Sequence, residues 1–147
     1  PELAVRSVDL IDLPGICHRG AVAAVFDGFR VIGTHLSLGQ PARIAQMRTL
    51  GQYLARQPKM PTILAGDMNE WRPWGGLAFS PRIIQASLEG PARRSFPSGC
   101  PLLPLDRILA GQGASVLSLD VLSGQDIGDA SDHRPILASV SFEGRGT

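Results

Sequence analysis

The stretch TILAGDMNE, residues 62–70, decides the fold of this 147-residue chain. Its first four residues form a short, mostly apolar run, as expected of a buried strand. Gly66 lets the backbone leave that strand sharply, and Asp67 and Asn69 then point to the same side of an extended chain. A carboxylate beside a carboxamide can accept a proton or bind a hard cation. Standing alone, such a pair is more often a turn that caps the strand.

The segments before this stretch predict three strands and one long helix. Residues 21–26 and 29–35 are apolar runs separated by an Asp-Gly pair, which is typical of a type I′ hairpin. Residues 40–56 carry a proline in the first turn and apolar residues at three- and four-residue steps, so we expect a helix there. A further strand is expected at residues 4–13, which mix apolar side chains with charges.

The segments after it predict more strands. Between residues 71 and 104 the pattern is loose and rich in proline, and it suggests only a short helix at 75–79 and a strand fragment at 83–86. Strands and a helix in this order indicate a layered α/β arrangement, and without a linker-like segment residues 1–147 are expected to form a single domain. Three further strands are predicted at residues 105–110, 114–122 and 135–142.

Three other polar motifs stand at the ends of predicted strands: THLS at residues 34–37, LDRI at 105–108 and SDHRP at 131–135. Together with GDMNE at 66–70 they supply two histidines, three aspartates and an asparagine. Each motif is weak by itself. As an ordered set they fit metal-assisted hydrolysis of a phosphate ester.

His133 is expected to pair with Asp106. Histidine titrates near neutral pH and serves as a general acid or base when a carboxylate holds its ring. Asp132 is its sequence neighbour, so the two side chains diverge, whereas Asp106 opens an apolar strand where an unpaired charge is costly. The alternative for Asp106 is a solvated strand end. For His35 the alternative is an ordinary, partly buried histidine.

Composition narrows the remaining choices. The formal net charge is +1, which makes a dedicated nucleic-acid binder less expected. Cys17 and Cys100 lack the spacing of zinc ligands or of a disulfide framework, so a reducing compartment, and with it a cytoplasmic location, is slightly favoured. No apolar run approaches the length of a membrane span. The chain begins without Met, and we expect it to be a processed product or a piece of something longer.

The ordered motifs resemble the endonuclease/exonuclease/phosphatase family, whose members include deoxyribonuclease I, exonuclease III and sphingomyelinases. The matching text is THLSL, the helix with Arg43 and Gln46, GDMNEW, SFPSGCPLLPLDRIL and ASDHRPI, over about residues 20–142. The resemblance implies the deoxyribonuclease I-like fold, a four-layered sandwich of two mostly antiparallel sheets with outer helices. It also implies an active site at one edge of that sandwich.

Carried over by position, His133 is similar to the family's catalytic histidine and Asp106 to its orienting carboxylate. Asp67 is similar to the aspartate that orients or deprotonates the attacking water. The resemblance implies Mg²⁺ or Mn²⁺ as the cofactor and a phosphate ester as the substrate. That ester can be nucleic acid, a phospholipid headgroup or a small phosphoester.

The resemblance assigns three more residues. Asn69 is similar to a phosphate-contacting amide, His35 to the histidine that contacts the phosphate, and Asp132 to a metal-site carboxylate. The family's N-terminal half, with an asparagine and the principal metal-binding glutamate, has no counterpart here, and the chain is expected to be the C-terminal portion of a longer enzyme. Alone it should be inactive, and it should form a homodimer, associate with the missing half or carry a rearranged core.

Two readings of function follow. The first is a metal-dependent phosphodiesterase, nuclease or phosphatase, active as the longer protein. The second is a catalytically incomplete fragment or interaction module that keeps the fold without a full metal site.

Overall fold

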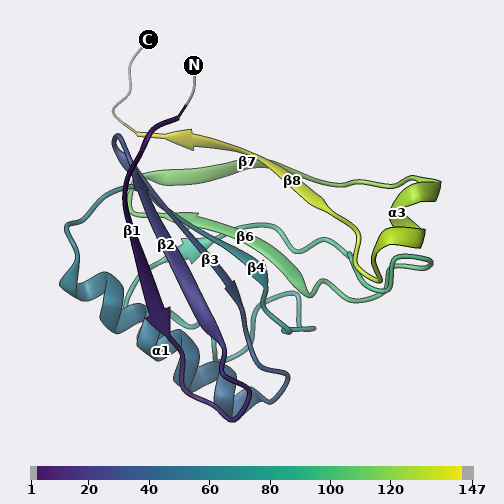
Figure 1. Ribbon diagram of the computed structural model, residues 1–147, viewed down its shortest axis with the longest axis horizontal. Coiled ribbons are helices and arrows are strands. Elements are labelled where there is room, and N and C mark those ends of the chain that lie inside the picture. The colour runs from purple at the N-terminus through teal and green to yellow at the C-terminus, as the bar shows by residue number, and fades with distance from the viewer. Residues whose placement is uncertain (1–2, 144–147) are drawn as a thin grey trace.

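A computed structural model describes residues 3–143 (Figure 1). It contains a six-stranded sheet in the order β1-β2-β3-β4-β6-β5 and a two-stranded sheet of β7 and β8. All neighbouring strands are antiparallel except β3 and β4. The strands of the large sheet are β1 (Val5–Asp12), β2 (Gly20–Phe26), β3 (Phe29–His35), β4 (Thr62–Asp67), β5 (Leu88–Glu89) and β6 (Asp106–Gly111). The remaining elements are β7 (Ala114–Val121), β8 (Ile136–Phe142), α1 (Gln40–Arg56), α2 (Pro81–Ile84) and α3 (Gln125–Ala130).

The register of the central strands sets the position of the polar motifs. In the parallel pair β3–β4, His35 lies opposite Asp67. In the antiparallel pair β4–β6, Asp67 lies opposite Asp106. These three residues, far apart in the sequence, therefore form a row across the ends of the neighbouring strands β3, β4 and β6. Gly66 makes this row possible: it has φ +141°, and a Cβ there would lie 1.8 Å from the carbonyl oxygen of Thr34.

The hydrophobic core lies between α1 and one face of the large sheet. Met47 and Leu50 of α1 are fully buried against Leu64 of β4 and Ile32 of β3, which is 1% exposed. Burial of such side chains stabilises the fold by about 1.5–3 kcal/mol each. The short helix α2 packs on α1 so closely that a Cβ on Gly51 would lie 2.3 Å from the carbonyl oxygen of Ile84.

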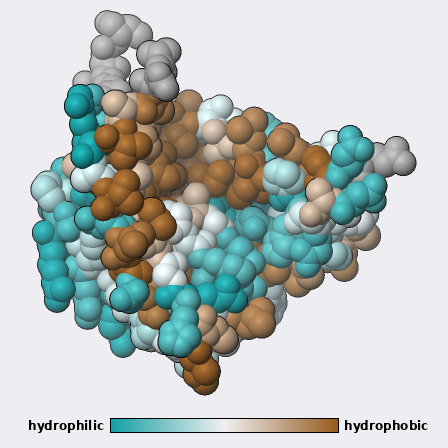
Figure 2. All heavy atoms as spheres, viewed as in Figure 1, coloured by the Kyte–Doolittle hydropathy of each residue, from teal (hydrophilic) through white to brown (hydrophobic). Residues whose placement is uncertain are grey.

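The opposite face of the large sheet is open. Val8, Leu10 and Val22 are 55%, 81% and 47% exposed there, and Figure 2 shows hydrophobic side chains over β1 and β2. The chain leaves β6 through a turn at residues 112–113 and forms the second sheet, whose two strands lie at an angle to the first in Figure 1. Two mostly antiparallel sheets with helices outside confirm the predicted fold class.

Several local predictions were wrong. The turn at residues 27–28 is not type I′, because Gly28 is its only central residue with positive φ (86°). Residues 76–79 form turns in place of the helix predicted at 75–79, and residues 83–84 of the strand predicted at 83–86 belong to helix α2. Ser80 begins that helix by accepting a hydrogen bond from the Arg82 amide at 3.3 Å. Within residues 3–143, no helix has the length and apolar character that a membrane crossing requires.

Candidate active site

The predicted pair of His133 and Asp106 is present. His133 lies in the loop before β8, and its Nδ1 is 2.8 Å from Oδ2 of Asp106 at the start of β6. The hydroxyl of the buried Ser95 donates to the same carboxylate oxygen. Because Nδ1–H donates to Asp106, the second ring nitrogen Nε2 is left facing the sheet edge. The pairing joins two segments that are 27 positions apart in the sequence.

Asp67 stands between the two histidines. Its Oδ2 is 3.3 Å from Nε2 of His35 and 3.9 Å from Nε2 of His133. Its Oδ1 accepts a hydrogen bond from the backbone amide of Asn69 at 2.8 Å. Ligand atoms of Asp67, Asp106 and His133 all lie within 4.8 Å of one another, close enough to hold one metal ion. Four of the six predicted residues therefore meet at one point.

The electrostatics at this point favour the protonated imidazole. Burial lowers the pKa of His133, but the hydrogen bond that its ring donates to Asp106 and the negative charges of Asp106, Asp67 and Asp132 outweigh this effect, so the pKa is raised overall. The ring also contacts Phe96, with ring centroids 4.8 Å apart. The imidazole is thus fixed on one side by a carboxylate and on the other by an aromatic ring.

Asn69 and Asp132 contribute differently from the other four. Asn69 has a positive φ of 49°, and its side-chain amide Nδ2 donates to the carbonyl oxygen of Leu36 at 2.8 Å. One of its N–H groups therefore joins two loops of the site. Asp132 is exposed, and its carboxylate is not part of the close group, although its charge acts on His133. The roles assigned to both residues stay predictions.

A buried ion-pair network, which the sequence motifs did not predict, lies beneath the site. Glu70 is fully buried, and its carboxylate receives hydrogen bonds from Arg43 of α1 at 3.3 Å and from Arg72 at 2.8 Å. Arg43 also donates to the carbonyl oxygens of Ser37 and Leu38, in the loop that follows His35. The sequence gives one hint of this network: a glutamate directly follows the GDMN motif, and several arginines that could pair with it occur elsewhere in the chain.

Arg107 extends this network to β6. It is 1% exposed and follows Asp106 directly. Its guanidinium donates to the carbonyl oxygens of Arg72 at 2.7 Å and Pro73 at 3.1 Å. Burial lowers the pKa of Arg107, while the charge of Glu70 opposes that change. The loop that follows Asp67 and the start of β6, which carries Asp106, are therefore joined by charged side chains.

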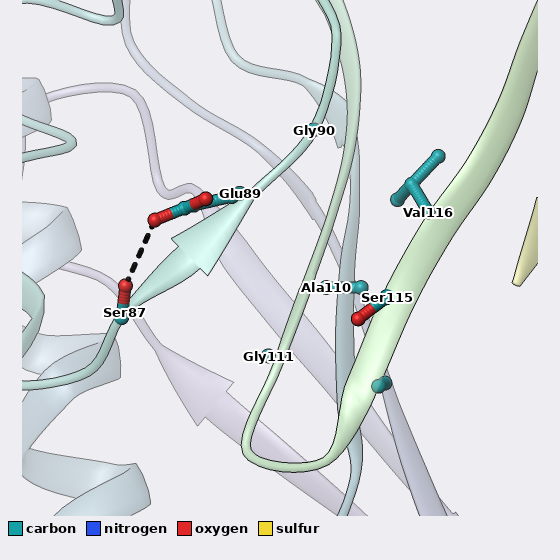
Figure 3. A pocket seen from close by; sticks show the side chains of 8 residues that line it. Ser87, Glu89, Gly90, Ala110, Gly111, Ser115 and Val116 are labelled. Carbon is teal, nitrogen blue, oxygen red and sulfur yellow. Dashed lines mark hydrogen bonds between the residues drawn. The ribbon is translucent and has the colours of Figure 1, made fainter. Parts of the chain in front are cut away.

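Clefts of similar size occur at several places among residues 3–143, and the two compared below differ in whether the predicted residues line them. The cleft between β5, β6 and β7 has a volume of about 390 Å³, and none of the six predicted residues lines it (Figure 3). There Ser87 donates a hydrogen bond to Glu89 at 3.2 Å. The other cleft, about 400 Å³, is lined by Leu38, Asn69, Trp71, Phe96, Leu103, Leu105 and His133.

Comparison with known proteins gives the same family for nearly the whole chain. The model of the endonuclease/exonuclease/phosphatase family matches residues 3–133. The uncharacterized protein YbhP of Escherichia coli (strain K12) is 34% identical over 118 residues, which cover 75% of this chain and 45% of YbhP. YbhP of Shigella flexneri matches equally well. The chain thus spans less than half the length of these curated relatives.

Solved structures share the fold at low sequence identity. The mannosyl-6-phosphatase Bt3783 of Bacteroides thetaiotaomicron has a TM-score of 0.69 at 17% identity, over 95% of this chain and 67% of that one. The human Nocturnin catalytic domain has a TM-score of 0.71 at 20% identity, over 95% and 60%. TDP2 of D. rerio, solved with a single-stranded DNA product, has a TM-score of 0.68 at 17% identity, over 95% and 68%. These likenesses show the fold, and the family model matched over residues 3–133 shows that the chain belongs to the endonuclease/exonuclease/phosphatase family.

Proposed function

We propose that this chain supplies the histidine-bearing part of the active site of a metal-dependent phosphoesterase. One observation carries the proposal: the imidazole of His133 is held by Asp106 at 2.8 Å, and its free nitrogen faces the carboxylate of Asp67 at 3.9 Å. A carboxylate that can accept a proton from water, opposite an imidazole that can donate a hydrogen bond to a phosphoryl oxygen, is suited to hydrolysis of a phosphate ester. Membership of the family supports the same reaction class.

Each residue then has a distinct task. Asp67 orients the attacking water and accepts its proton. His133, protonated at Nε2, donates a hydrogen bond to the phosphoryl oxygen and stabilises the charge that develops there. Asp106 fixes the tautomer and the orientation of the ring. His35, whose Nε2 is 3.3 Å from Asp67, contacts a second phosphoryl oxygen, and the carboxamide of Asn69 also contacts the phosphate.

The donor set fits a divalent cation in part. Oδ2 of Asp67 is directed at the open site, whereas Oδ2 of Asp106 already accepts hydrogen bonds from His133 and Ser95. Mg²⁺ and Mn²⁺ prefer several oxygen ligands, so Asp67 would hold the ion with help from other groups. The metal-site role of Asp132, whose carboxylate lies outside the close group, stays a prediction. When bound, such an ion would neutralise negative charge on the phosphate.

We propose further that residues 1–147 alone are inactive or nearly so. Loss of a principal metal ligand removes several kcal/mol of charge stabilisation, which corresponds to orders of magnitude in rate. The incomplete-fragment reading makes a different prediction, because it requires the longer protein to be inactive as well. Hydrolysis by the full-length protein separates the two readings.

The test uses full-length protein, bis-p-nitrophenyl phosphate and p-nitrophenyl phosphate, with Mg²⁺, with Mn²⁺ and with a chelator. We expect metal-dependent release of nitrophenol and a loss of about 10²–10⁴-fold in kcat for His133→Gln. The matched control is His18→Gln, which replaces an exposed histidine in the loop between β1 and β2. Activity that survives His133→Gln, or that is absent from the full-length protein, would overturn the proposal.

A further inference from the structure

Ser95 contacts both segments that carry the pair of His133 and Asp106, and the proposed reaction gives this serine no task. Its side chain is fully buried, and it lies 11 positions before Asp106 in the sequence. A buried hydroxyl beside a catalytic pair can attack the substrate, fill space, or hold its neighbours in position. The contacts of Ser95 distinguish these three tasks.

The hydroxyl of Ser95 is bound to Asp106 in both directions. Its Oγ accepts a hydrogen bond from the backbone amide of Asp106 at 3.4 Å and donates one to Oδ2 of the same residue. Because the amide faces a lone pair of Oγ, the hydroxyl proton is left to point at the carboxylate. Nδ1 of His133 donates to that same Oδ2 at 2.8 Å. One carboxylate oxygen therefore accepts hydrogen bonds from two different elements.

Two donors on one oxygen restrict the rotation of the Asp106 carboxylate. The last torsion of an aspartate side chain has a broad energy profile, so a single hydrogen bond leaves the carboxylate free to turn. A turned carboxylate would weaken the bond to Nδ1 of His133, and that bond fixes the tautomer and the orientation of the imidazole. The Ser95 hydroxyl opposes this rotation, because turning Oδ2 away would leave a buried donor unpaired.

The backbone around Ser95 holds the loop that carries His133. The carbonyl oxygen of Ser95 accepts a hydrogen bond at 2.8 Å from the amide of Arg134, the residue that follows His133. The ring of Phe96, the residue after Ser95, lies against the imidazole at a centroid distance of 4.8 Å. Ser95 thus binds the start of β6, through Asp106, and the loop before β8, through Arg134.

The same geometry excludes a direct chemical task for Ser95. A nucleophilic serine needs a base at its own oxygen and an open path to the substrate. The Ser95 hydroxyl donates to the carboxylate of Asp106 instead of to the imidazole, and its side chain is closed to solvent. Space filling alone does not require a hydroxyl, since alanine is at least as common in such buried positions. The contacts therefore favour the holding of Asp106.

We propose that Ser95 is a positioning residue of this site: its hydroxyl orients the carboxylate of Asp106, and its backbone aligns the His133 loop with that carboxylate. The effect on catalysis rests on the proposed phosphoesterase function, whereas the orientation of the pair does not. Because Ser95 does not touch the substrate, its removal should lower kcat and leave KM unchanged. Outer partners of this kind change activity by about 10–100-fold.

The kinetic experiment uses the full-length protein and bis-p-nitrophenyl phosphate. We expect Ser95→Ala to lower kcat by about 10-fold or more at unchanged KM. Ser95→Cys tests the same point without leaving a cavity, because a thiol of similar size is only a weak donor, and it should lose a similar factor. The matched control is Ser98→Ala, which removes a half-buried hydroxyl from the same loop and should keep the wild-type rate.

Proton NMR of the same proteins supplies a readout that does not depend on activity. A hydrogen bond to a carboxylate protects the Nδ1 proton of a histidine from exchange with water, so this proton should give a resonance that His133→Gln abolishes. We expect the resonance in the wild type and in Ser98→Ala, and its loss by exchange in Ser95→Ala and Ser95→Cys.

The outcomes separate the positioning role from the enzymatic function. The positioning proposal is wrong if the wild type lacks the resonance, if both Ser95 variants keep the resonance or the wild-type kcat, if KM changes in place of kcat, or if Ser98→Ala loses as much. A resonance that depends on Ser95, in a full-length protein without hydrolytic activity, would instead refute the phosphoesterase function alone.

Discussion

His133 receives its protonation state from side chains on other elements. Its burial opposes a charge, and the raised pKa arises from the hydrogen bond to Asp106 and from the nearby carboxylates. A raised pKa stabilises the folded state at pH values below that of an unfolded histidine, about 6.5. That contribution is lost as the pH rises through the folded-state pKa. The same shift keeps more of the imidazole protonated near neutral pH, as its proposed role requires.

Asp106→Asn should reverse this shift. The amide removes the charge and weakens the hydrogen bond while burial remains, so the pKa of His133 should fall. Titration of the His133 ring by NMR measures the change directly. We expect kcat of the full-length protein to fall by about 10²-fold or more, since a poorly oriented and unprotonated ring is a poor acid. An unchanged pKa would show that Asp106 does not hold the ring in solution.

Glu70→Gln should destabilise the protein strongly. The change leaves the buried guanidinium of Arg43 and the half-buried guanidinium of Arg72 without their shared anion. Breaking a buried pair by removing one partner costs about 3–5 kcal/mol in the free energy of unfolding. Denaturant unfolding measures this loss. The matched control is Glu89→Gln at an exposed position, which should change stability by about 0.5 kcal/mol or less. Equal effects of the two substitutions would contradict the network.

At the scale of elements, the contact between α1 and α2 reverses a usual rule. Alanine in place of a helical glycine normally stabilises by about 1 kcal/mol. At Gly51 the new methyl group would lie 2.3 Å from the carbonyl oxygen of Ile84. We expect Gly51→Ala to lower the free energy of unfolding by about 1–3 kcal/mol, the cost of overpacking.

Gly128→Ala in α3 is the matched control, since the added carbon meets nothing within 4 Å. Thermal or denaturant unfolding should show a neutral or stabilising effect there. A stabilising effect of Gly51→Ala would mean that the two helices separate easily.

Elements with a strong local pattern were predictable from the sequence. The helix at residues 40–56 matches α1, because its apolar period and its proline act locally. Helix α2 was not predicted because four residues are too few to show a helical period. The only local indications of a helix are Ser80 at its N-cap and Pro81 at its first position. The pairing of His133 with Asp106 was predictable from the cost of an unpaired charge. The network of Glu70 was not, since its burial depends on Arg43 and Arg72 being brought together by the folded chain.

At the scale of the whole molecule, the open sheet face predicts association. Val8, Leu10 and Val22 expose apolar surface over β1 and β2, and monomeric proteins rarely leave such patches uncovered. We expect residues 1–147, produced alone, to sediment as more than a monomer, and Leu10→Ser to shift them toward the monomer. In the longer protein the same substitution should lower stability instead. Two results together would refute this expectation: residues 1–147 sediment strictly as a monomer, and Leu10→Ser leaves the stability of the longer protein unchanged.

The buried arginines fix the backbone of the loops around the site, so substitutions of the outward-facing loop side chains are tolerated better than substitutions of the arginines themselves. Arg43 and Arg107 bind backbone carbonyl oxygens, so they hold the loops without regard to which side chains those loops display. Residues such as Ile16 and Leu38 can therefore be exchanged for others while the spacing of Asp67, Asp106 and His133 is kept. A directed-evolution library confined to such outward-facing positions would alter what the protein accepts, and most of its members would still fold.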